Sequence, residues 1–265
     1  MNKRSLVVSK ASNTGKTLLF YLVLIVIWEV AYLIGTQWLG VWKSYAFPEP
    51  LGVLRAGMRM AADGSLWYAV AYSGIRAAVG FLLSAIIGIG FGIILSVGKK
   101  NIAHYLRPFL MGIQTLPSVC WVPFAILWFG LDEQAIIFVV IMGASFSITL
   151  SVDSAIRNVN PLLIRAARTM GAEGRTLYTK VIVPAGLPAF IAGLRQGWSF
   201  AWRALMAGEV MSSTIGLGHS LMMGRDLADI NQVMLVMLVI VLLGIIIDRG
   251  VISQVETKVL KSRGL

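Results

Sequence analysis

Long apolar runs alternate with short polar stretches along most of this chain. A helix rises about 1.5 Å per residue, so about 20 apolar residues cross a hydrocarbon layer about 30 Å thick. We expect six membrane-spanning helices, at about residues 17–38, 67–97, 108–129, 135–155, 188–211 and 232–252. The third run contains Pro108, Pro117 and Pro123 and should be kinked or interrupted. The pattern therefore predicts an all-α integral membrane protein, with a short surface helix over 51–62.

Small residues mark the faces on which these helices should pack. Ser84, Gly88 and Gly92 recur every four residues in the second run. Such a stripe lets two helix backbones approach closely inside a membrane. The fourth run carries a similar set, Gly143, Ala144, Ser145, Ser147, Thr149 and Ser151. We expect both runs to lie in the interior of the helix bundle.

Composition agrees with a membrane protein and excludes several other classes. Hydrophobic residues make up 57% of the 265 residues and charged residues only 13%, whereas soluble domains have about 25% charged residues. The mean hydropathy is +0.80. The single Cys120 excludes a disulfide framework and a multi-cysteine metal site. His104 and His219 lack ligand spacing, so we expect no metal site and no cofactor held by this chain.

The segment 160–188 is polar and basic, although it lies between two apolar runs. It carries Arg165, Arg168, Arg175 and Lys180, and each cation would cost about 2.5–3.5 kcal/mol at the membrane centre. Asn160 is a good N-cap, and Pro161 fits the first helical position. A helix should follow, with an apolar stripe of Leu162, Ala166, Ala167 and Met170, and Gly171 can end it in a left-handed turn. A second helical run presents Leu177, Tyr178, Val181 and Ile182 on one face until Pro184 interrupts it.

The net charge of +11 indicates topology rather than nucleic-acid binding, because the basic residues gather on one side of the membrane. With six spans both chain ends share that side. Besides the 160–188 segment, it holds Lys3, Arg4, Lys10, Lys16, Lys99, Lys100, Arg107, Arg157, Arg195, Arg249, Lys258, Lys261 and Arg263. By the positive-inside rule, both termini and the segment should be cytoplasmic. We therefore expect a cytoplasmic tail over 1–16, a first helix with a periplasmic surface segment over 17–66, a core of five helices over 67–252, and a cytoplasmic tail over 253–265.

The basic segment is either an interfacial connector or a docking element for another protein, and its spacing favours docking. Its small and bulky positions resemble the EAA loop of ABC-importer permeases; they are Ala166, Ala167, Gly171, Ala172, Tyr178, Val181, Pro184 and Pro188. That family has Glu-Ala-Ala, three residues, Gly, and later a bulky residue, an aliphatic residue and two prolines four apart. Two positions depart from it, because Arg165 stands for the usual Glu and Tyr178 for a frequent Phe.

Residues 45–250 more broadly resemble the permeases of nitrate, sulfonate, taurine and bicarbonate importers. The matching stretches include Ser73-Gly-Ile-Arg76, Trp121-Val-Pro123, Ala207-Gly-Glu209 and Gly216-Leu-Gly218. The resemblance implies the type I ABC importer permease fold, with a cytoplasmic coupling-helix hairpin between spans four and five. It also implies two ATPase subunits that hold ATP and Mg, a periplasmic or lipid-anchored substrate-binding protein, and a second permease copy. The setting would be the bacterial inner membrane.

The chain has no Walker A pattern, since Gly98-Lys99-Lys100 lacks the upstream glycine and the Ser or Thr. It should not hydrolyse ATP, so energy must arrive through contact with a partner. We expect a permease for a small oxyanion or organic anion. A related permease for a nitrogenous compound or an aromatic acid is an alternative, and so is a scaffold that transports nothing. An intramembrane enzyme would need clustered catalytic side chains at membrane depth, and the sequence has none.

A few polar residues at membrane depth are candidates for the translocation pathway. Arg203 should have either a carboxylate partner on another helix or a role in lending positive potential to an anion path. Glu209, six residues later, lies on another face of the same helix. Arg76 should lie near the outer end of its span, where its head reaches water. Further candidates are Gln114, Ser118, Ser145 and Ser199, although helix-packing hydrogen bonds could also explain them.

Overall fold

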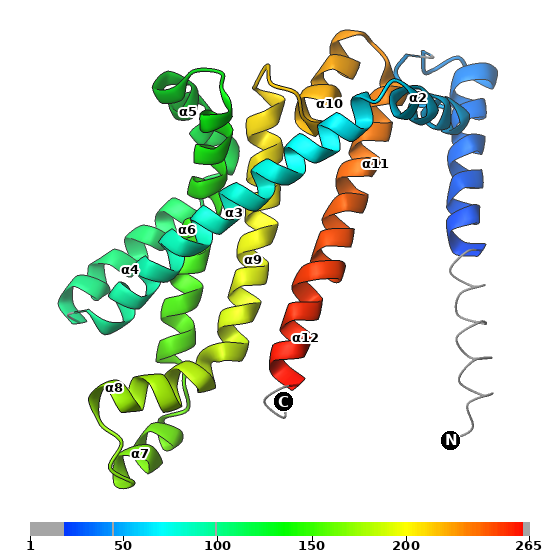
Figure 1. Ribbon diagram of the computed structural model, residues 1–265. Helices are drawn as coiled ribbons and strands as arrows, with labels where there is room; N and C mark the ends of the chain where they lie inside the picture. Colours follow the sequence, from blue (N-terminus) through cyan, green and yellow to red (C-terminus); the bar gives the residue numbers. More distant parts are fainter. Residues whose placement is uncertain (1–18, 44, 99, 262–265) are drawn as a thin grey trace, which may run out of the picture. The chain divides into compact units, whose positions relative to one another are not determined.

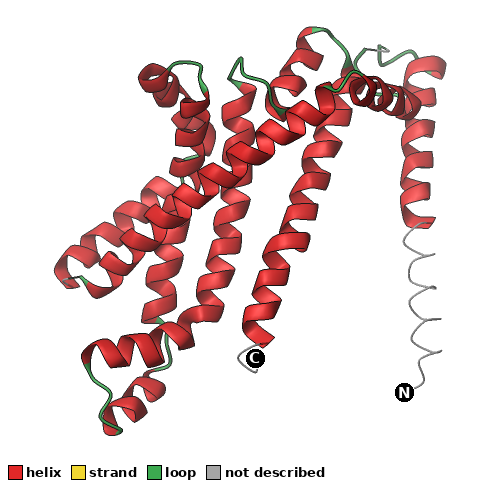
Figure 2. Ribbon diagram, in the orientation of Figure 1, coloured by secondary structure: helices red, strands yellow, loops and turns green. Residues whose placement is uncertain are grey.

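Every regular element in the described part of the chain is helical (Figures 1 and 2). The computed structural model describes residues 19–43, 45–98 and 100–261. The first described helix spans Leu19–Trp38 and ends in a π-helical turn. Further helical elements follow it along the chain. They are α2 (Pro50–Ala62), α3 (Ser65–Val97), α4 (Lys100–Gln114), η2 (Ser118–Trp121), α5 (Val122–Phe129), α6 (Glu133–Arg157), α7 (Pro161–Thr169), α8 (Gly174–Leu177), η3 (Tyr178–Ile182), α9 (Val183–Val210), α10 (Leu217–Asp226), α11 (Ile230–Ile247), η4 (Asp248–Ile252) and α12 (Ser253–Lys261).

The membrane-spanning segments agree with the predicted runs. Within the described residues, 5 helices are long and apolar enough to cross a membrane, or up to 6 if one bent pair forms a single span. The continuous ones are Leu19–Trp38, Ser65–Val97, Glu133–Arg157, Gly174–Val210 and Ile230–Gly250. The bent pair is Asn101–Gln114 with Ser118–Phe129, which meet at 96°. The predicted interruption of the third run is thus confirmed, and it falls at Pro117, which has no N–H to continue a helix.

The predicted N-terminal tail lies outside the described residues, and so does the end of the predicted C-terminal tail. Residues 1–16 and Lys99 are not described, and neither are 262–265. The described part of the C-terminal tail forms helix α12. The domain boundaries expected from the sequence stay a prediction. By its contacts the chain divides into one unit of residues 1–66 and 221–238 and another of residues 67–220 and 239–265.

The first unit contains α2, the predicted surface helix, and the start of α11. The Arg59 guanidinium lies 2.6 Å from the Asp229 carboxylate. The Asn231 side-chain oxygen accepts a hydrogen bond from the Glu49 N–H over 3.0 Å. These polar contacts, one at each end of α2, hold that helix beside the start of α11.

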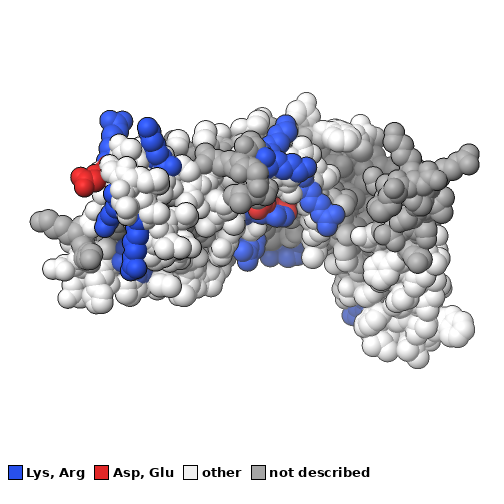
Figure 3. Space-filling view, turned by 90° about the horizontal axis from the view of Figure 1, so that it is seen from below, with Lys and Arg blue, Asp and Glu red and all other residues white. Residues whose placement is uncertain are grey.

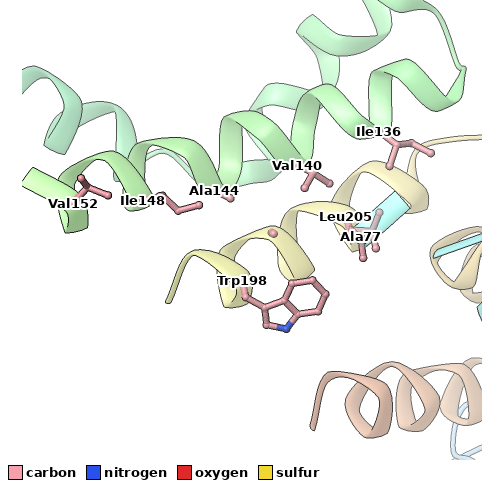
Figure 4. Packing of buried hydrophobic residues seen from close by; sticks show 9 residues of the cluster. Ala77, Ile136, Val140, Ala144, Ile148, Val152, Trp198 and Leu205 are labelled. Carbon is pink, nitrogen blue, oxygen red and sulfur yellow. The ribbon is translucent and has the colours of Figure 1, made fainter. Parts of the chain in front are cut away.

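The second unit is built on three long helices, α3, α6 and α9. Its core is a cluster of buried residues, Ala77, Ile136, Val140, Ala144, Ile148, Val152, Trp198, Ala201 and Leu205, most of them labelled in Figure 4. Glycines set the spacing of the helices, as the stripe of small residues predicts. A Cβ on Gly88 of α3 would lie 2.7 Å from Ile148 Cβ of α6, and one on Gly193 of α9 would lie 2.3 Å from Ser151 Cβ. These contacts hold the three helices closely together.

Candidate functional site

Arg76 in α3 and Glu209 in α9 form an ion pair that is shut off from solvent. Their side chains are 3% and 0% exposed. Arg76 Nη1 donates to Glu209 Oε1 over 3.1 Å and to the Ile215 carbonyl over 2.7 Å. Its Nη2 donates to Glu133 Oε1 over 2.9 Å. Charges buried in this way need several partners, because desolvation costs several kcal/mol per ion.

The link between α9 and α10 folds directly onto the Glu209 carboxylate. Ser73 Oγ lies 2.8 Å and 2.7 Å from the two carboxylate oxygens, and it accepts a hydrogen bond from the Leu217 N–H. The Gly218 N–H donates to Glu209 Oε2 over 3.0 Å. A carboxylate is favourable at this place because it satisfies free N–H groups at the N-terminus of α10. A Cβ on Gly216 would lie 2.6 Å from Glu209 Cδ, so a larger residue there would have to displace the carboxylate.

The expectation that Arg76 reaches water at the end of its span is wrong. Its guanidinium is buried because Glu209, Glu133 and the Ile215 carbonyl give it partners inside the protein. Sequence reasoning overlooked this cluster. The available signal was the presence of Arg76 and Glu209, two opposite charges, inside runs that are otherwise apolar.

A polar cleft lies at the break of the third span. Its volume is about 270 Å³. The lining residues are Ile113, Gln114, Thr115, Leu116, Pro117, Ser118, Trp121, Met142, Gly143, Phe200 and Arg203. The broken span contributes Gln114, Thr115 and Ser118 to the lining, and each of these side chains has a hydrogen-bonding group. Three of the predicted pathway residues, Gln114, Ser118 and Arg203, meet in this cleft.

Arg203 is exposed and carries its charge into the cleft from α9. Its Nε donates to the Ser199 carbonyl over 3.0 Å, and its guanidinium carbon lies 4.7 Å from the centre of the Phe200 ring. Among the described residues, no carboxylate lies within ion-pairing distance of Arg203. The sequence allowed either a carboxylate partner or a place beside an anion path, and the described residues supply no such partner.

The remaining pathway candidates are not among the residues that line the cleft. Glu209 is enclosed in the ion pair with Arg76. Ser145 is buried, and its carbonyl accepts a hydrogen bond from Thr149 Oγ1 on the same helix. Ser199 is exposed, and its Oγ donates to the Arg195 carbonyl over 3.4 Å. Each of these contacts links helical residues rather than lining the cleft.

A short helical hairpin, residues 160–182, connects α6 to α9 at their lower ends in Figure 1. Asn160 caps α7, because its side chain accepts a hydrogen bond from the Leu162 N–H over 2.9 Å. Gly171 ends α7 with φ at 82°. The Ala172 N–H donates to the Ala167 carbonyl and the Gly171 N–H to the Arg168 carbonyl, both over 2.9 Å, which is the Schellman arrangement. Both ends of α7 therefore form as the sequence predicts.

The residues of the predicted docking motif divide between the hairpin's interior and its surface. Ala167 is buried with Val159, Leu177 and Ile182, while Ala172 and Val181 pack against them in part. Ala166 and Gly171 are exposed, and the Tyr178 side chain is 37% exposed. Leu162 and Met170 are 70% and 81% exposed. The apolar stripe of α7 is thus an open surface for the most part, whereas Ala167 holds the hairpin together.

The hairpin continues into α9 without interruption, which contradicts the expected break at Pro184. Residues Gly174–Val210 form one helix of 37 residues. A π-helical turn over Tyr178–Ile182 joins the two parts, with the Val183 N–H donating to the Tyr178 carbonyl. Pro184 fits in the first turn of α9, and Pro188 lies inside that helix. A displacement of the hairpin can therefore pass along a single helix to Arg203.

The end of the second unit that bears the hairpin is rich in basic side chains. Seen from below, Lys and Arg outnumber Asp and Glu on the visible surface (Figure 3). The exposed cations of the hairpin include Arg165, Arg168, Arg175 and Lys180. This distribution is typical of the cytoplasmic side of a membrane protein.

Comparison with known proteins relates this arrangement to membrane transport. Residues 88–259 match the family described as the binding-protein-dependent transport system inner membrane component. A Bacillus subtilis protein named as an aliphatic sulfonates transport permease, SsuC, is 33% identical over 94% of this chain and 87% of its own length. The chain belongs to this family of ABC-importer permeases. The nitrate import permease NrtB of Leptolyngbya laminosa is 26% identical to this permease, over 70% of this chain and 66% of its own length.

The fold of the permease also resembles a solved importer. The inward-facing MetNI methionine ABC transporter matches it with a TM-score of 0.61 and 20% identity, over 74% of this chain and 96% of the other. This likeness supports the type I importer permease fold. As a permease subunit, the chain is a multi-pass protein of the inner membrane, and in such importers ATP hydrolysis takes place in a separate subunit. The family match includes the cleft and the hairpin, whereas Ser73 and Arg76 precede it.

Proposed function

We propose that this permease imports a small oxyanion or organic anion through a path that passes the Arg203 cleft. The observation that carries the proposal is the exposed Arg203 on the wall of that cleft, whose charge has no carboxylate partner among the residues that the structure describes. A cation in an apolar span costs about 2.5–3.5 kcal/mol. Each Leu, Ile, Phe or Val offsets only about 0.3–0.6 kcal/mol of that cost. A function for the charge explains why it is present.

The other polar groups of the cleft suit an anion as well. The Gln114 amide and the Ser118 hydroxyl can each donate a hydrogen bond, whereas the Thr115 hydroxyl donates to the Gly112 carbonyl over 2.6 Å. A guanidinium pairs well with the flat or tetrahedral oxygens of an oxyanion, because its N–H groups form a planar fork. The aliphatic sulfonates and nitrate named for two similar permeases are anions of this kind.

Removal of the Arg203 charge should reduce uptake strongly. A hydrogen bond to a charged group is worth about 1.5–3 kcal/mol, so we expect Arg203→Ala to lower anion uptake about 10- to 100-fold. Arg203→Lys should retain part of the rate, because it keeps the charge but loses the fork. The measurement is uptake of labelled nitrate and of an alkanesulfonate into vesicles that hold the complete importer.

The matched control is Arg55→Ala, which removes an exposed arginine of α2, far from the cleft residues in sequence. It should take up the anion at the wild-type rate. Unchanged anion uptake in Arg203→Ala, with normal protein levels, contradicts the proposed path. Uptake of a nitrogenous compound or an aromatic acid, but of neither anion, would identify a different substrate. A complex that transports none of these solutes would favour a scaffold.

We further infer that both termini and the 160–182 hairpin are cytoplasmic and that the hairpin docks on an ATPase. The basic surface around the hairpin supports this orientation. The expected partners are a dimer of ATPase subunits, which hold ATP and Mg, a second copy of this permease, and a substrate-binding protein on the opposite side. The similarity to binding-protein-dependent importers favours these partners.

The docking surface would be the open face of α7 together with Tyr178. Leu162 and Met170 offer apolar area, and the small Ala166 leaves room for close approach to the partner. Arg165, exposed on the same helix, would meet the partner where related permeases have Glu. An acidic group on the ATPase is therefore expected opposite Arg165.

Filling the small position of this surface should disrupt docking. Ala166→Leu adds bulk at an exposed helical position, which leaves the hairpin folded but keeps the partner from approaching closely. We expect the amount of ATPase that co-purifies with the permease to fall at least tenfold. Ala185→Leu is the matched control, because Ala185 is also exposed and helical but lies in α9, beyond the hairpin. Equal co-purification of the ATPase with both variants would argue against docking through α7.

A further inference from the structure

The cluster around Arg76 has one half that is fully enclosed. The Glu209 carboxylate receives hydrogen bonds from Ser73, Arg76 and Gly218 and has no exposed surface. Separating such a pair without replacing the partners leaves an uncompensated charge in the protein interior. We therefore treat the contact between Arg76 and Glu209 as permanent during transport.

The other half of the cluster is open to solvent. Arg76 Nη2 bonds Glu133 Oε1 over 2.9 Å, and the Glu133 side chain is 56% exposed. If this contact breaks, water solvates the Glu133 carboxylate, whereas the guanidinium end is 3% exposed and keeps Glu209 and the Ile215 carbonyl. Each charge then still has a favourable interaction. Breaking the contact costs more than the about 0.2–1 kcal/mol of a fully exposed pair, but less than separating Arg76 from Glu209.

Glu133 lies where two segments meet, at the end of the second unit opposite the hairpin (Figure 1). It is the first residue of α6 and directly follows the turn 130–132 after α5. Ser212 Oγ, in the link after α9, donates to the Leu131 carbonyl over 3.3 Å. Leu131 and Ala135 line a hollow of only about 10 Å³ together with Met211 and Ser212, so the α5–α6 turn lies close against the end of α9.

We propose that Arg76 is a positioning residue for transport, anchored by Glu209, and that its contact with Glu133 is a latch on the outer end of the pathway. In the closed state the latch holds the α5–α6 turn against the α9–α10 link. Release of Glu133 frees that turn and opens a route from outside to the cleft beside Arg203. The inference rests on the proposed coupling to an ATPase, because opening of the outer end is then tied to ATP hydrolysis.

The test uses the complete importer in lipid vesicles and compares Glu133→Gln with the wild type. A weaker latch shifts the equilibrium toward the open outer end by at most the free energy of the contact. We expect ATPase activity without binding protein to rise about two- to fivefold, which corresponds to about 0.4–1 kcal/mol. The amount of anion taken up per ATP should fall. Asp132→Asn is the control, because it removes an equal charge from the same turn without touching Arg76.

A second variant separates the latch from a general structural effect. Arg76→Lys keeps a cation beside Glu209, but a single ammonium cannot also reach Glu133 as the guanidinium fork does. We expect it to raise the ATPase activity as Glu133→Gln does, with no further rise in the double variant. If the ATPase activity of Glu133→Gln equals that of the wild type, the latch is overturned. It is also overturned if the ATPase activity of the double variant rises by the product of the two single-variant increases. A wild-type complex whose ATPase never responds to the permease would instead overturn the proposed coupling.

Discussion

Replacement of Glu209 by alanine is expected to lower the free energy of unfolding by about 3–5 kcal/mol. The substitution leaves the Arg76 guanidinium, 3% exposed, with only the solvent-exposed Glu133 as a carboxylate partner. It also removes the acceptor of the Ser73 hydroxyl and of the Gly218 N–H, both of which are buried. Each such orphaned group adds its own desolvation cost. Denaturant unfolding of the purified permease in detergent micelles measures the loss.

The neighbouring variants show whether the loss comes from the unpaired charge. Arg76→Met together with Glu209→Ala removes both charges, so it should recover part of the stability that Glu209→Ala loses. Glu133→Gln should cost about 1 kcal/mol or less, because Glu133 is exposed. A loss below about 1 kcal/mol in Glu209→Ala would mean that the pair contributes little to the fold.

The features that the sequence predicts well depend on neighbours along the chain. The ends of α7 follow from Asn160 and Gly171, whose conformations are set by hydrogen bonds within a few residues. The spans follow from apolar runs, because a bilayer selects by length and hydropathy. The interruption at Pro117 follows from the missing N–H of proline. Each of these inferences needs no knowledge of which helices touch.

The contacts of charged residues could not be predicted in the same way. The sequence offers Arg76 and Arg203 as cations and Glu133 and Glu209 as acids, but the pairs form between α3, α6 and α9. The packing of these helices decides which arginine lies beside the Glu209 carboxylate, and that arginine is Arg76. The continuity of Gly174–Val210 was missed for a related reason. Pro184 in the sequence predicts a helix break, but the π-helical turn before it lets the helix continue.

The packing of α3, α6 and α9 bears on how movement could reach the cleft. The three helices share one buried cluster, so they should move together rather than slide past one another. The second arm of the hairpin, from Gly174, is one helix with α9, and Arg203 lies on that helix. The broken span has a bend of 96° and lines the cleft with residues of α4, of η2 and of the turn between them. Under the proposed function, a shift of α9 relative to this span would change the width of the cleft.

Gly88→Leu should lower the stability of the permease by about 3 kcal/mol, at the upper end of overpacking costs. A Cβ at Gly88 would lie 2.7 Å from Ile148 Cβ and 2.9 Å from the Ser145 carbonyl oxygen. The carbonyl belongs to the backbone of α6 and cannot turn aside, so the longer leucine side chain must push α3 and α6 apart. That movement would disturb the buried cluster that includes Ala144 and Ile148. Thermal unfolding in detergent and the amount of protein in the membrane both report the loss.

Gly90→Leu is the matched control, made two residues away on the same helix. A Cβ at Gly90 would meet no atom within 4 Å, so the leucine would have open space. Replacing a glycine in a helix by leucine gains about 0.5–1 kcal/mol of helix propensity. Gly90→Leu should therefore be as stable as the wild type or slightly more so, and the two variants should differ by about 3–4 kcal/mol in unfolding free energy. Equal stability of the two would show that α3 does not depend on close approach to α6 at Gly88.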